Sequence, residues 1–475
     1  MARQEITQYL IYRWRYILGY TLVGLLLAGM LTFAGLFVPG GISAAEQESV
    51  VRSEALNVGD ITSFAVPNVP YHLLQAASLE VFGVSEFTIK LPSLLLGLAS
   101  AIGLILLLRR WFRPNIAVLA SLIAVTTGQF VFIAQAGTPS IMYIFWPVVL
   151  LLLGTQITRA SHHRLLWKVL FGIAVATSLY TPLSIYVLLA IAITISLHPH
   201  LRNAVRRLSK LKVASVTTLA GLIVVPLALA IIDRPSLGLT LLGLPTSWPI
   251  DLFANFTLQL RQYFIFWEPS ATTLLTPVFG LGTLLLIGLG LYRLFKTRET
   301  TRSYLIITWI VALIPILVLN PSITSIVFIP AVLLLAAGLT SLIDYWYRLF
   351  PRNPYARIAG LIPLIVLVAT LIGAGIDRYV YGYHYSPSIA SNFSQDLGLL
   401  PKSKVQLVVS DDQTSFYRAV ASYRPSLNVV TVPTESKILV TNKARPTIPA
   451  DYRITRIITN TYANDGDRFY EYQKS

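Results

Sequence analysis

Long apolar runs dominate residues 1–376. Each is long enough, or nearly so, to cross a bilayer as a helix, which takes about 20 residues. The runs at 165–180 and 183–197 are separated only by Thr181–Pro182 and are interpreted as a tight helix pair, with one broken re-entrant segment as the alternative. The first run is longer than the core of a typical signal peptide, so it is interpreted as an uncleaved span. Eleven spans are predicted, at 17–38, 91–108, 116–134, 141–157, 165–180, 183–197, 213–232, 272–291, 304–319, 324–343 and 358–376.

The composition changes after residue 376, where short apolar segments replace the long runs. Such short segments are typical of strands. One segment, Asp411–Tyr423, instead predicts a helix that opens near Asp411 or Asp412. The tail therefore predicts a small α/β domain, with strands at Val405–Ser410, Leu427–Val432, Lys437–Thr441, Ile454–Thr459 and Arg468–Gln473.

Composition supports a membrane protein. Of 475 residues, 55% are hydrophobic and 12% charged, and the mean hydropathy is +0.66. A soluble domain carries about 25% charged residues, so a cytosolic enzyme, a secreted domain and a disordered chain are excluded. The sequence has no cysteine, which excludes disulfides, a thiolate nucleophile and cysteine-ligated metals.

The distribution of positive charge predicts the orientation. Of the 37 Lys and Arg residues, 21 fall in alternate loops beginning with the N-terminal segment, four in the opposite loops and 12 after residue 376. Because cytoplasmic loops are enriched in Lys and Arg, the N-terminus is predicted inside. Most of the basic residues behind the net charge of +16 then face anionic lipid of the inner leaflet, so the charge does not indicate nucleic-acid binding. The predicted fold is an all-α polytopic bundle of about eleven transmembrane helices in the plasma membrane (1–376), followed by an extracytoplasmic α/β domain (377–475).

Two predicted outer loops are long enough to carry chemistry. The loop at 39–90 is acidic, and the loop at 233–271 contains a segment, 251–267, with Phe, Leu and Trp at helical spacing. Such a segment predicts an amphipathic helix lying in the outer interface of the membrane.

Three segments of the first half carry a family resemblance: VPYHLLQA at 69–76, FGVSEFTIKLPS at 82–93 and LRRWF at 108–112. They resemble the bacterial C-type membrane glycosyltransferases related to protein O-mannosyltransferase and the aminoarabinose lipid A transferase. The tail motifs LPKSKV at 400–405 and FYEY at 469–472 resemble the small outer domain of such chains. The resemblance implies transfer of a sugar from a polyprenyl-phosphate-linked donor to an envelope acceptor (protein, lipid or glycan).

The resemblance also indicates where catalytic acids are expected. The family has an Asp-Glu pair early in the first outer loop, and here Glu46 occupies its second position while Ala45 stands in place of the Asp. The stretch 135–140, where a second acid is often found, contains no carboxylate. An acceptor hydroxyl must lose its proton as it attacks the sugar, so Glu46 or Glu48 is the expected catalytic group.

A sugar donor linked through phosphate requires a cation nearby. Arg261 is the first candidate, followed by Arg52 and Arg234, with anchoring at the interface as the alternative role of each. Further substrate contacts are expected from His72, Tyr263 and Trp267. Mg²⁺ or Mn²⁺ could bind the outer-loop carboxylates, although no spacing indicates a site. Glu46 or Glu48 and Arg261 are predicted to face one pocket, with the tail domain roofing its aqueous side.

Two other functions stay open. The missing Asp at position 45 and the acid-free stretch at 135–140 favour a catalytically silent relative that binds lipid-linked sugar or scaffolds envelope assembly. A transporter or flippase ranks third, because the spans are almost free of charge and no internal symmetry is visible.

Overall fold

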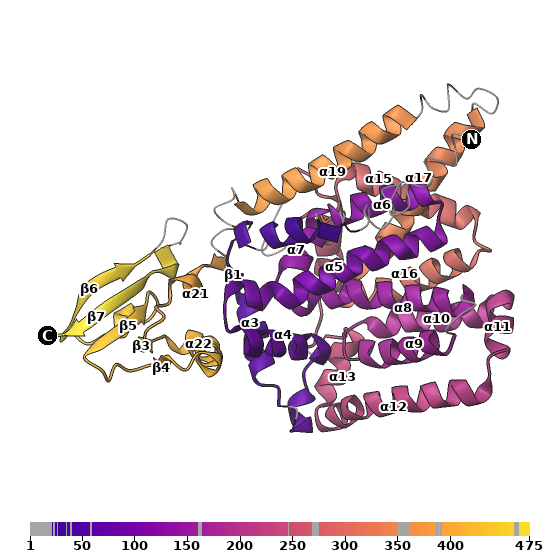
Figure 1. The fold of residues 1–475 in the computed structure, drawn as a ribbon. Coiled ribbons are helices and arrows are strands. Elements are labelled where there is room, and N and C mark those ends of the chain that lie inside the picture. The colour runs from indigo at the N-terminus through magenta and orange to yellow at the C-terminus, as the bar shows by residue number, and fades with distance from the viewer. Residues whose placement is uncertain are drawn as a thin grey trace, which may run out of the picture.

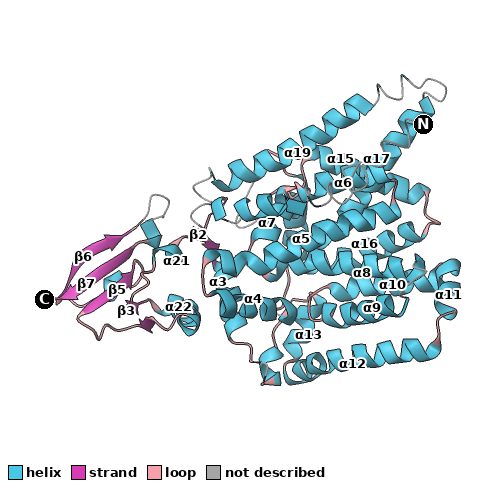
Figure 2. Cartoon of the chain, viewed as in Figure 1, coloured by secondary structure: helices cyan, strands magenta, loops and turns pink. Residues whose placement is uncertain are grey.

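The computed structural model describes residues 21–475, with gaps at 22–23, 26, 35, 39, 58, 160–163, 246, 268–274, 350–354, 356–358, 360, 385–388, 390–391 and 460–464 (Figures 1 and 2). The first predicted span, 17–38, and the start of the predicted span 272–291 lie partly outside the described residues.

The described part is a helical bundle with a small sheet domain attached at one end (Figure 2). Six of its helices are long and apolar enough to cross a membrane, or up to eight spans if two bent pairs each count as one. The predicted helical membrane bundle with a small α/β tail is therefore confirmed, whereas the number eleven and the orientation remain predictions. The bundle helices are α3 (Ala44–Glu54), α4 (Val69–Phe82), α5 (Glu86–Trp111), α6 (Pro114–Val125), α7 (Gly128–Gln135), α8 (Met142–Arg159), α9 (Arg164–Ser178), α10 (Ser184–Leu197), α11 (Pro199–Arg206), α12 (Lys210–Asp233), α13 (Pro235–Leu242), α14 (Leu252–Phe264), α15 (Leu281–Lys296), α16 (Thr301–Leu319), α17 (Phe328–Leu349) and α19 (Leu361–His384).

One predicted span, 116–134, is a broken helix. Its halves, α6 and α7, meet at an angle of 63°. Thr127 opens α7 as its N-cap, with Oγ1 accepting a hydrogen bond from the Phe130 amide at 3.3 Å. An N-cap side chain satisfies an amide that a new helix start leaves free, so the sequence Thr127–Gly128 favours a restart at this point.

The runs at 165–180 and 183–197 form two helices, α9 and α10. They are joined by a short turn in which Leu183 adopts a left-handed conformation with φ of 63°. α9 packs mainly against α8 and α12, while α10 packs mainly against α16. The helix-pair interpretation therefore describes this region.

Loops predicted to share one side of the membrane lie together. At one end of the bundle, Arg113 and Arg293 both pair with Asp344 of α17, at 3.2 and 2.9 Å. At the other end, the Asn68 amide donates to the Tyr180 carbonyl at 2.7 Å, which joins the segment before α4 to the α9–α10 turn. These contacts bring together three predicted inner loops at one end and two predicted outer segments at the other.

The tail is an α/β domain with a five-stranded sheet in the order β4-β3-β5-β7-β6. β3 pairs in parallel with β4 and β5, whereas β7 pairs antiparallel with β5 and β6. All five predicted strands are present, and the predicted helix Asp411–Tyr423 is confirmed as α22, with Ser410 as its N-cap and both aspartates in its first turn. The elements are β3 (Val405–Val408), β4 (Leu427–Val430), β5 (Lys437–Thr441), β6 (Tyr452–Ile458), β7 (Phe469–Lys474), α21 (Asp396–Leu399) and α22 (Asp411–Tyr423).

The tail is docked on the first loop of the bundle (Figure 1). β1 (Ile42–Ser43) pairs antiparallel with β2 (Phe393–Ser394), immediately before α3 begins. Gly41 allows this approach, because a Cβ there would lie 2.9 Å from the Ser394 carbonyl oxygen. One face of α3, with Val50 fully buried, packs against Phe416 and Val420 of α22 in a shared apolar cluster. Docking therefore fixes the position of α3.

Candidate active site

The candidate site lies where α3, α4, the start of α5 and the segment 135–140 converge. Ser43 caps α3 in a reciprocal arrangement with Glu46, each side chain bonding the other's backbone amide. The sequence carries the signature of this capping box, a Ser followed three residues later by Glu, and this signature indicates a structural role for Glu46.

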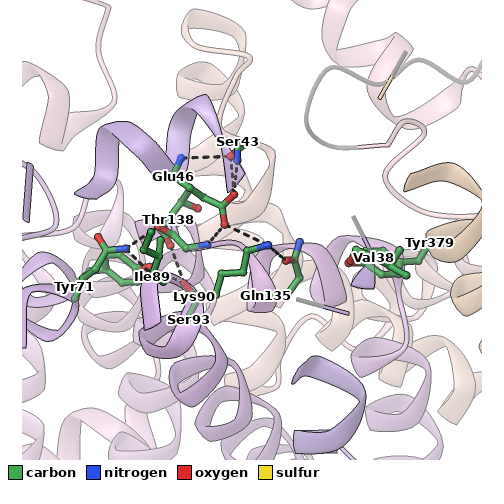
Figure 3. Close-up of polar contacts among 12 residues, drawn as sticks. Val38, Ser43, Glu46, Tyr71, Ile89, Lys90, Ser93, Gln135, Thr138 and Tyr379 are labelled. Carbon is green, nitrogen blue, oxygen red and sulfur yellow. Dashed lines mark hydrogen bonds and ion pairs between the residues drawn. The ribbon is translucent and has the colours of Figure 1, made fainter. Parts of the chain in front are cut away.

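Glu46 is held as a buried structural clamp (Figure 3). Its Oε2 accepts hydrogen bonds from the Ser43 amide at 2.7 Å and the Ser43 hydroxyl at 3.0 Å. Its Oε1 accepts from the Gly137 amide at 2.6 Å and lies 3.8 Å from the Lys90 ammonium, which donates to Gln135 at 3.2 Å. The Glu46 and Lys90 side chains are each 1% exposed. Glu46 thus joins α3 to α5 and to the segment after α7.

A second buried network lies beside the clamp. Gln75 of α4 accepts hydrogen bonds from Ser49 and Ser53 of α3, at 2.7 and 2.8 Å. Its amide nitrogen donates to the carbonyls of Ile89 and Gly137, each at 3.0 Å. Because Gln75 satisfies four partners at once, it fixes the spacing of the same three segments.

A cleft of about 250 Å³, here called the first cleft, opens beside these networks. It is lined by one face of α3, by His72 and by residues 136–140, and Glu48 is the carboxylate in its lining. Glu48 pairs with Arg52 one turn away at 2.5 Å, and both side chains are well exposed, at 62% and 41%. Ala45 also lines the cleft, whereas Glu46 is not part of its lining. Of the two expected acids, the structure therefore places Glu48 at the cleft.

His72 forms part of the wall of the first cleft and is fully buried. Its Nδ1 lies 2.9 Å from the Ser53 hydroxyl. Among the described residues, no group forms a hydrogen bond with its Nε2. Burial lowers the pKa of His72 to about 4, and the positive charge of Arg52 acts in the same direction. The ring is consequently neutral at physiological pH.

A second cleft of about 630 Å³ adjoins the first and shares Arg52 and Pro139 with it. Its lining comes from the segment before α4, residues 240–250, Asn255 of α14 and the turn at 319–323. Arg52 is the charged side chain in this lining, which otherwise consists of proline, amide, hydroxyl and apolar groups. Arg52 therefore stands at the junction of the two clefts.

The predicted aromatic helix is present as α14, capped by the Asp251 carboxylate, which accepts from the Ala254 amide at 2.9 Å. Its amide side chains, Asn255 and Gln259, bond carbonyls at the end of α16 and in the turn that follows it. Its apolar face, with Phe253, Phe256 and Phe264, is exposed. A helix with one apolar, exposed face and one polar, packed face is suited to lie in a membrane interface.

The other predicted substrate-binding residues are dispersed. Arg261 is exposed on α14 and lines neither cleft, and Trp267 is likewise exposed and outside both linings. Tyr263 packs inward, with its ring stacked near Phe279 at 6.4 Å. Arg234 lies 3.7 Å from its exposed neighbour Asp233. The structure thus brings Glu48, Arg52 and His72 together, and Arg261 is not in that group.

The described residues contain no group of three or more His, Asp or Glu side chains arranged to hold a metal ion. The tail domain contributes no residue to the lining of either cleft. It lies behind α3, on the face that carries Val50, so it supports the helix that presents Glu48 and Arg52.

Comparison with known proteins shows a family match over part of the chain and a similar fold over nearly all of it. Residues 67–229 match the family model described as dolichyl-phosphate-mannose-protein mannosyltransferase. The solved structure of ArnT from Cupriavidus metallidurans bound to undecaprenyl phosphate superposes with a TM-score of 0.54 over 96% of this chain and 98% of that one, at 13% identity. Its apo form gives a TM-score of 0.50 over the same shares, also at 13% identity. No curated protein sequence matches the chain. The resemblance drawn from residues 67–113 is therefore confirmed: the chain has the fold of the C-type membrane glycosyltransferases.

Proposed function

We propose that this protein is an integral membrane glycosyltransferase that moves a sugar from a polyprenyl-phosphate-linked donor to a cell-envelope acceptor. The observation that carries the proposal is the position of Arg52 between two clefts, one containing Glu48 and His72 and the other bordered by α14. The fold match over nearly the whole of both chains supports it, since the matched structure contains undecaprenyl phosphate.

Arg52 is the group proposed to bind the donor phosphate. A guanidinium can form two parallel hydrogen bonds to phosphate, and Arg52 is the charged side chain in the second cleft. The carrier would then place its phosphate at headgroup depth, its polyprenyl chain in hydrocarbon beyond α14 and its sugar in the first cleft. Arg261 and Trp267, on the exposed side of α14 and just after it, would anchor that helix at the interface.

The proposed orientation follows from the charge asymmetry. In this orientation the N-terminus lies on the cytoplasmic side of the plasma membrane. The clefts and the tail domain, 377–475, lie on its outer side. Support comes from the packing, because both clefts occur at the end where the loops of low positive charge meet. A sugar transferred there would be delivered directly to an envelope acceptor.

An assay of membranes with radiolabelled polyprenyl-phospho-sugars tests the proposal. The expected result is transfer of label by wild type and a loss of about 10-fold or more in Glu48→Gln, because a negative group beside the reacting sugar is removed. Glu54→Gln is the matched control, since Glu54 lies on the same helix, is exposed and lines neither cleft. Equal activity in wild type and both variants would contradict the role given to Glu48.

A second function is favoured by one observation. Ala45 lines the first cleft at the position where an acid is expected, and the clamp formed with Lys90 and Gly137 keeps Glu46 out of that lining. A catalytically silent relative would bind the lipid-linked sugar saturably without releasing polyprenyl phosphate. Turnover with any polyprenyl-phospho-sugar excludes this alternative.

A further inference from the structure

One buried basic nitrogen in the site has no assigned partner. Among the described residues, the Nε2 atom of His72 forms no hydrogen bond, although the side chain is fully buried. An unsatisfied buried polar atom destabilises the folded state, and such atoms in native proteins commonly mark a catalytic role or a missing partner. His72 is also one of the residues that line the first cleft, so its ring borders the proposed reaction site.

The surroundings of the ring determine which nitrogen carries the proton. Nδ1 lies 2.9 Å from the Ser53 hydroxyl, which also lies 2.8 Å from both the Ser49 carbonyl and Gln75 Oε1. Both of these oxygens are acceptors, so the single proton of the Ser53 hydroxyl is donated to one of them and the hydroxyl oxygen accepts from the ring. A proton on Nδ1 leaves the lone pair on Nε2. Gln75, held by four partners, fixes this chain of hydrogen bonds and with it the ring.

The first cleft offers few other proton acceptors. Glu48, the carboxylate in its lining, is already paired with Arg52 at 2.5 Å. Ala45 and residues 136–140 contribute methyl, hydroxyl and proline groups. An uncharged nitrogen base in the wall is therefore the group best placed to accept a proton without first breaking an ion pair.

We propose that Nε2 of His72 is the general base that deprotonates the acceptor, and that the acceptor nucleophile is a hydroxyl group. This inference rests on the proposed function. In the step, the acceptor oxygen forms a bond to the anomeric carbon as its proton passes to Nε2. The bond from that carbon to the phosphate oxygen breaks, and its electron pair leaves with polyprenyl phosphate. The imidazolium then releases its proton to water.

Charge changes during the step favour this assignment. The donor phosphate carries one negative charge as a diester and gains a second as it leaves. A growing negative charge nearby stabilises an imidazolium, so His72 becomes a stronger base as the reaction proceeds. Arg52 disfavours the imidazolium beforehand, which keeps Nε2 free to accept a proton in the resting enzyme.

The test compares kcat, the KM for donor and thermal unfolding of wild type, His72→Asn and His200→Asn. Asparagine places a polar atom near the position of Nδ1 and can keep the contact with Ser53, but it has nothing at Nε2. The expected result is a fall in kcat of about 100-fold or more, as for loss of a general base, with donor KM changed less than about threefold. His200 is exposed on α11, away from the linings of both clefts, and its variant keeps wild-type activity.

A second variant separates a chemical role from a structural one. His72→Gly opens a space that imidazole can enter, and added imidazole is expected to restore part of its lost kcat. Activity of His72→Asn within about threefold of wild type would overturn the inference alone. Inactive variants with a lowered unfolding temperature and no imidazole rescue would also overturn it, since His72 would then be structural. Absence of turnover in wild type would overturn the proposed function and the inference with it.

Discussion

Replacing Glu46 with glutamine removes one charge from a buried ion pair. Lys90 then loses the carboxylate that lies 3.8 Å from its ammonium, in surroundings where both side chains are 1% exposed. At an effective dielectric constant of about 20, the direct attraction at this distance is roughly 4 kcal/mol. Breaking such a pair from one side costs about 3–5 kcal/mol. Glutamine has one acceptor oxygen where Glu46 has two, so either the Ser43 amide or the Gly137 amide faces an NH2 group, and the lost hydrogen bond adds about 1 kcal/mol.

The opposite substitution is expected to cost less. In Lys90→Met, the Glu46 carboxylate keeps the Ser43 amide, the Ser43 hydroxyl and the Gly137 amide as donors. A loss of about 2 kcal/mol is expected, because the remaining charge is still hydrogen-bonded. The double variant Glu46→Gln/Lys90→Met is expected to lose about 1–3 kcal/mol less free energy of unfolding than the two single losses add up to.

Reversible unfolding in detergent, followed by tryptophan fluorescence, measures these free energies. Glu48→Gln is the matched control, because its pair with Arg52 is exposed and such pairs contribute about 0–1 kcal/mol. A free energy of unfolding for Glu46→Gln within about 0.5 kcal/mol of wild type would refute the clamp. Additive losses in the double variant would refute the pairing with Lys90.

Two further predictions concern helix packing and the tail. Gly290→Ala is expected to destabilise the bundle by about 3 kcal/mol or more, because a Cβ there would lie 1.9 Å from the Leu334 carbonyl oxygen of α17. The control is Gly288→Ala on the same helix, where a Cβ would meet no atom within 4 Å and the unfolding temperature should stay unchanged or rise. Equal effects of the two substitutions would contradict the close crossing of the helices. Burial, together with the charge of Asp467, raises the pKa of Asp396 in the tail. The folded state then binds a proton more readily than the unfolded state, so the stabilising effect is present at low pH and is lost as pH rises through the raised pKa. Thermal unfolding of wild type between pH 4 and 7 should show this loss, and Asp396→Asn should reduce it; an unchanged pH dependence in the variant would contradict the assignment.

The tail domain could be predicted from sequence almost residue by residue. Its strands are short and rich in Val, Ile, Leu and Tyr, and β5 begins and ends at the predicted residues, Lys437 and Thr441. Local pattern suffices there, because the central strands β3 and β5 are short apolar runs that the sheet buries on both faces. The break between α6 and α7 was not predicted, because the polar residues 126–129 interrupt the apolar run only briefly and the signal is the capping residue Thr127.

The candidate site was predicted only in part. The resemblance indicated Glu46 and Glu48 but could not separate them, because the difference arises from contacts with Lys90 and Gly137, which are distant in sequence. Arg261 was ranked above Arg52 as the phosphate-binding residue because of its aromatic neighbours in sequence. Whether Arg261 lines a cleft depends on which face of α14 packs against α16, and the sequence does not show this. The free Nε2 of His72 likewise follows from three-dimensional packing and has no counterpart in local pattern.

The most direct test of the account is the release of polyprenyl phosphate by the purified protein in lipid nanodiscs. Polyprenyl-phospho-sugar and a hydroxyl acceptor are supplied, and the released carrier is measured by mass spectrometry for wild type, Arg52→Ala and Arg261→Ala. The account predicts carrier release by wild type, a loss of about 100-fold or more in Arg52→Ala, in line with removal of a group that stabilises the leaving phosphate, and near-normal release in Arg261→Ala. Release that survives in Arg52→Ala but is lost in Arg261→Ala, or saturable donor binding by wild type with no release, would contradict it.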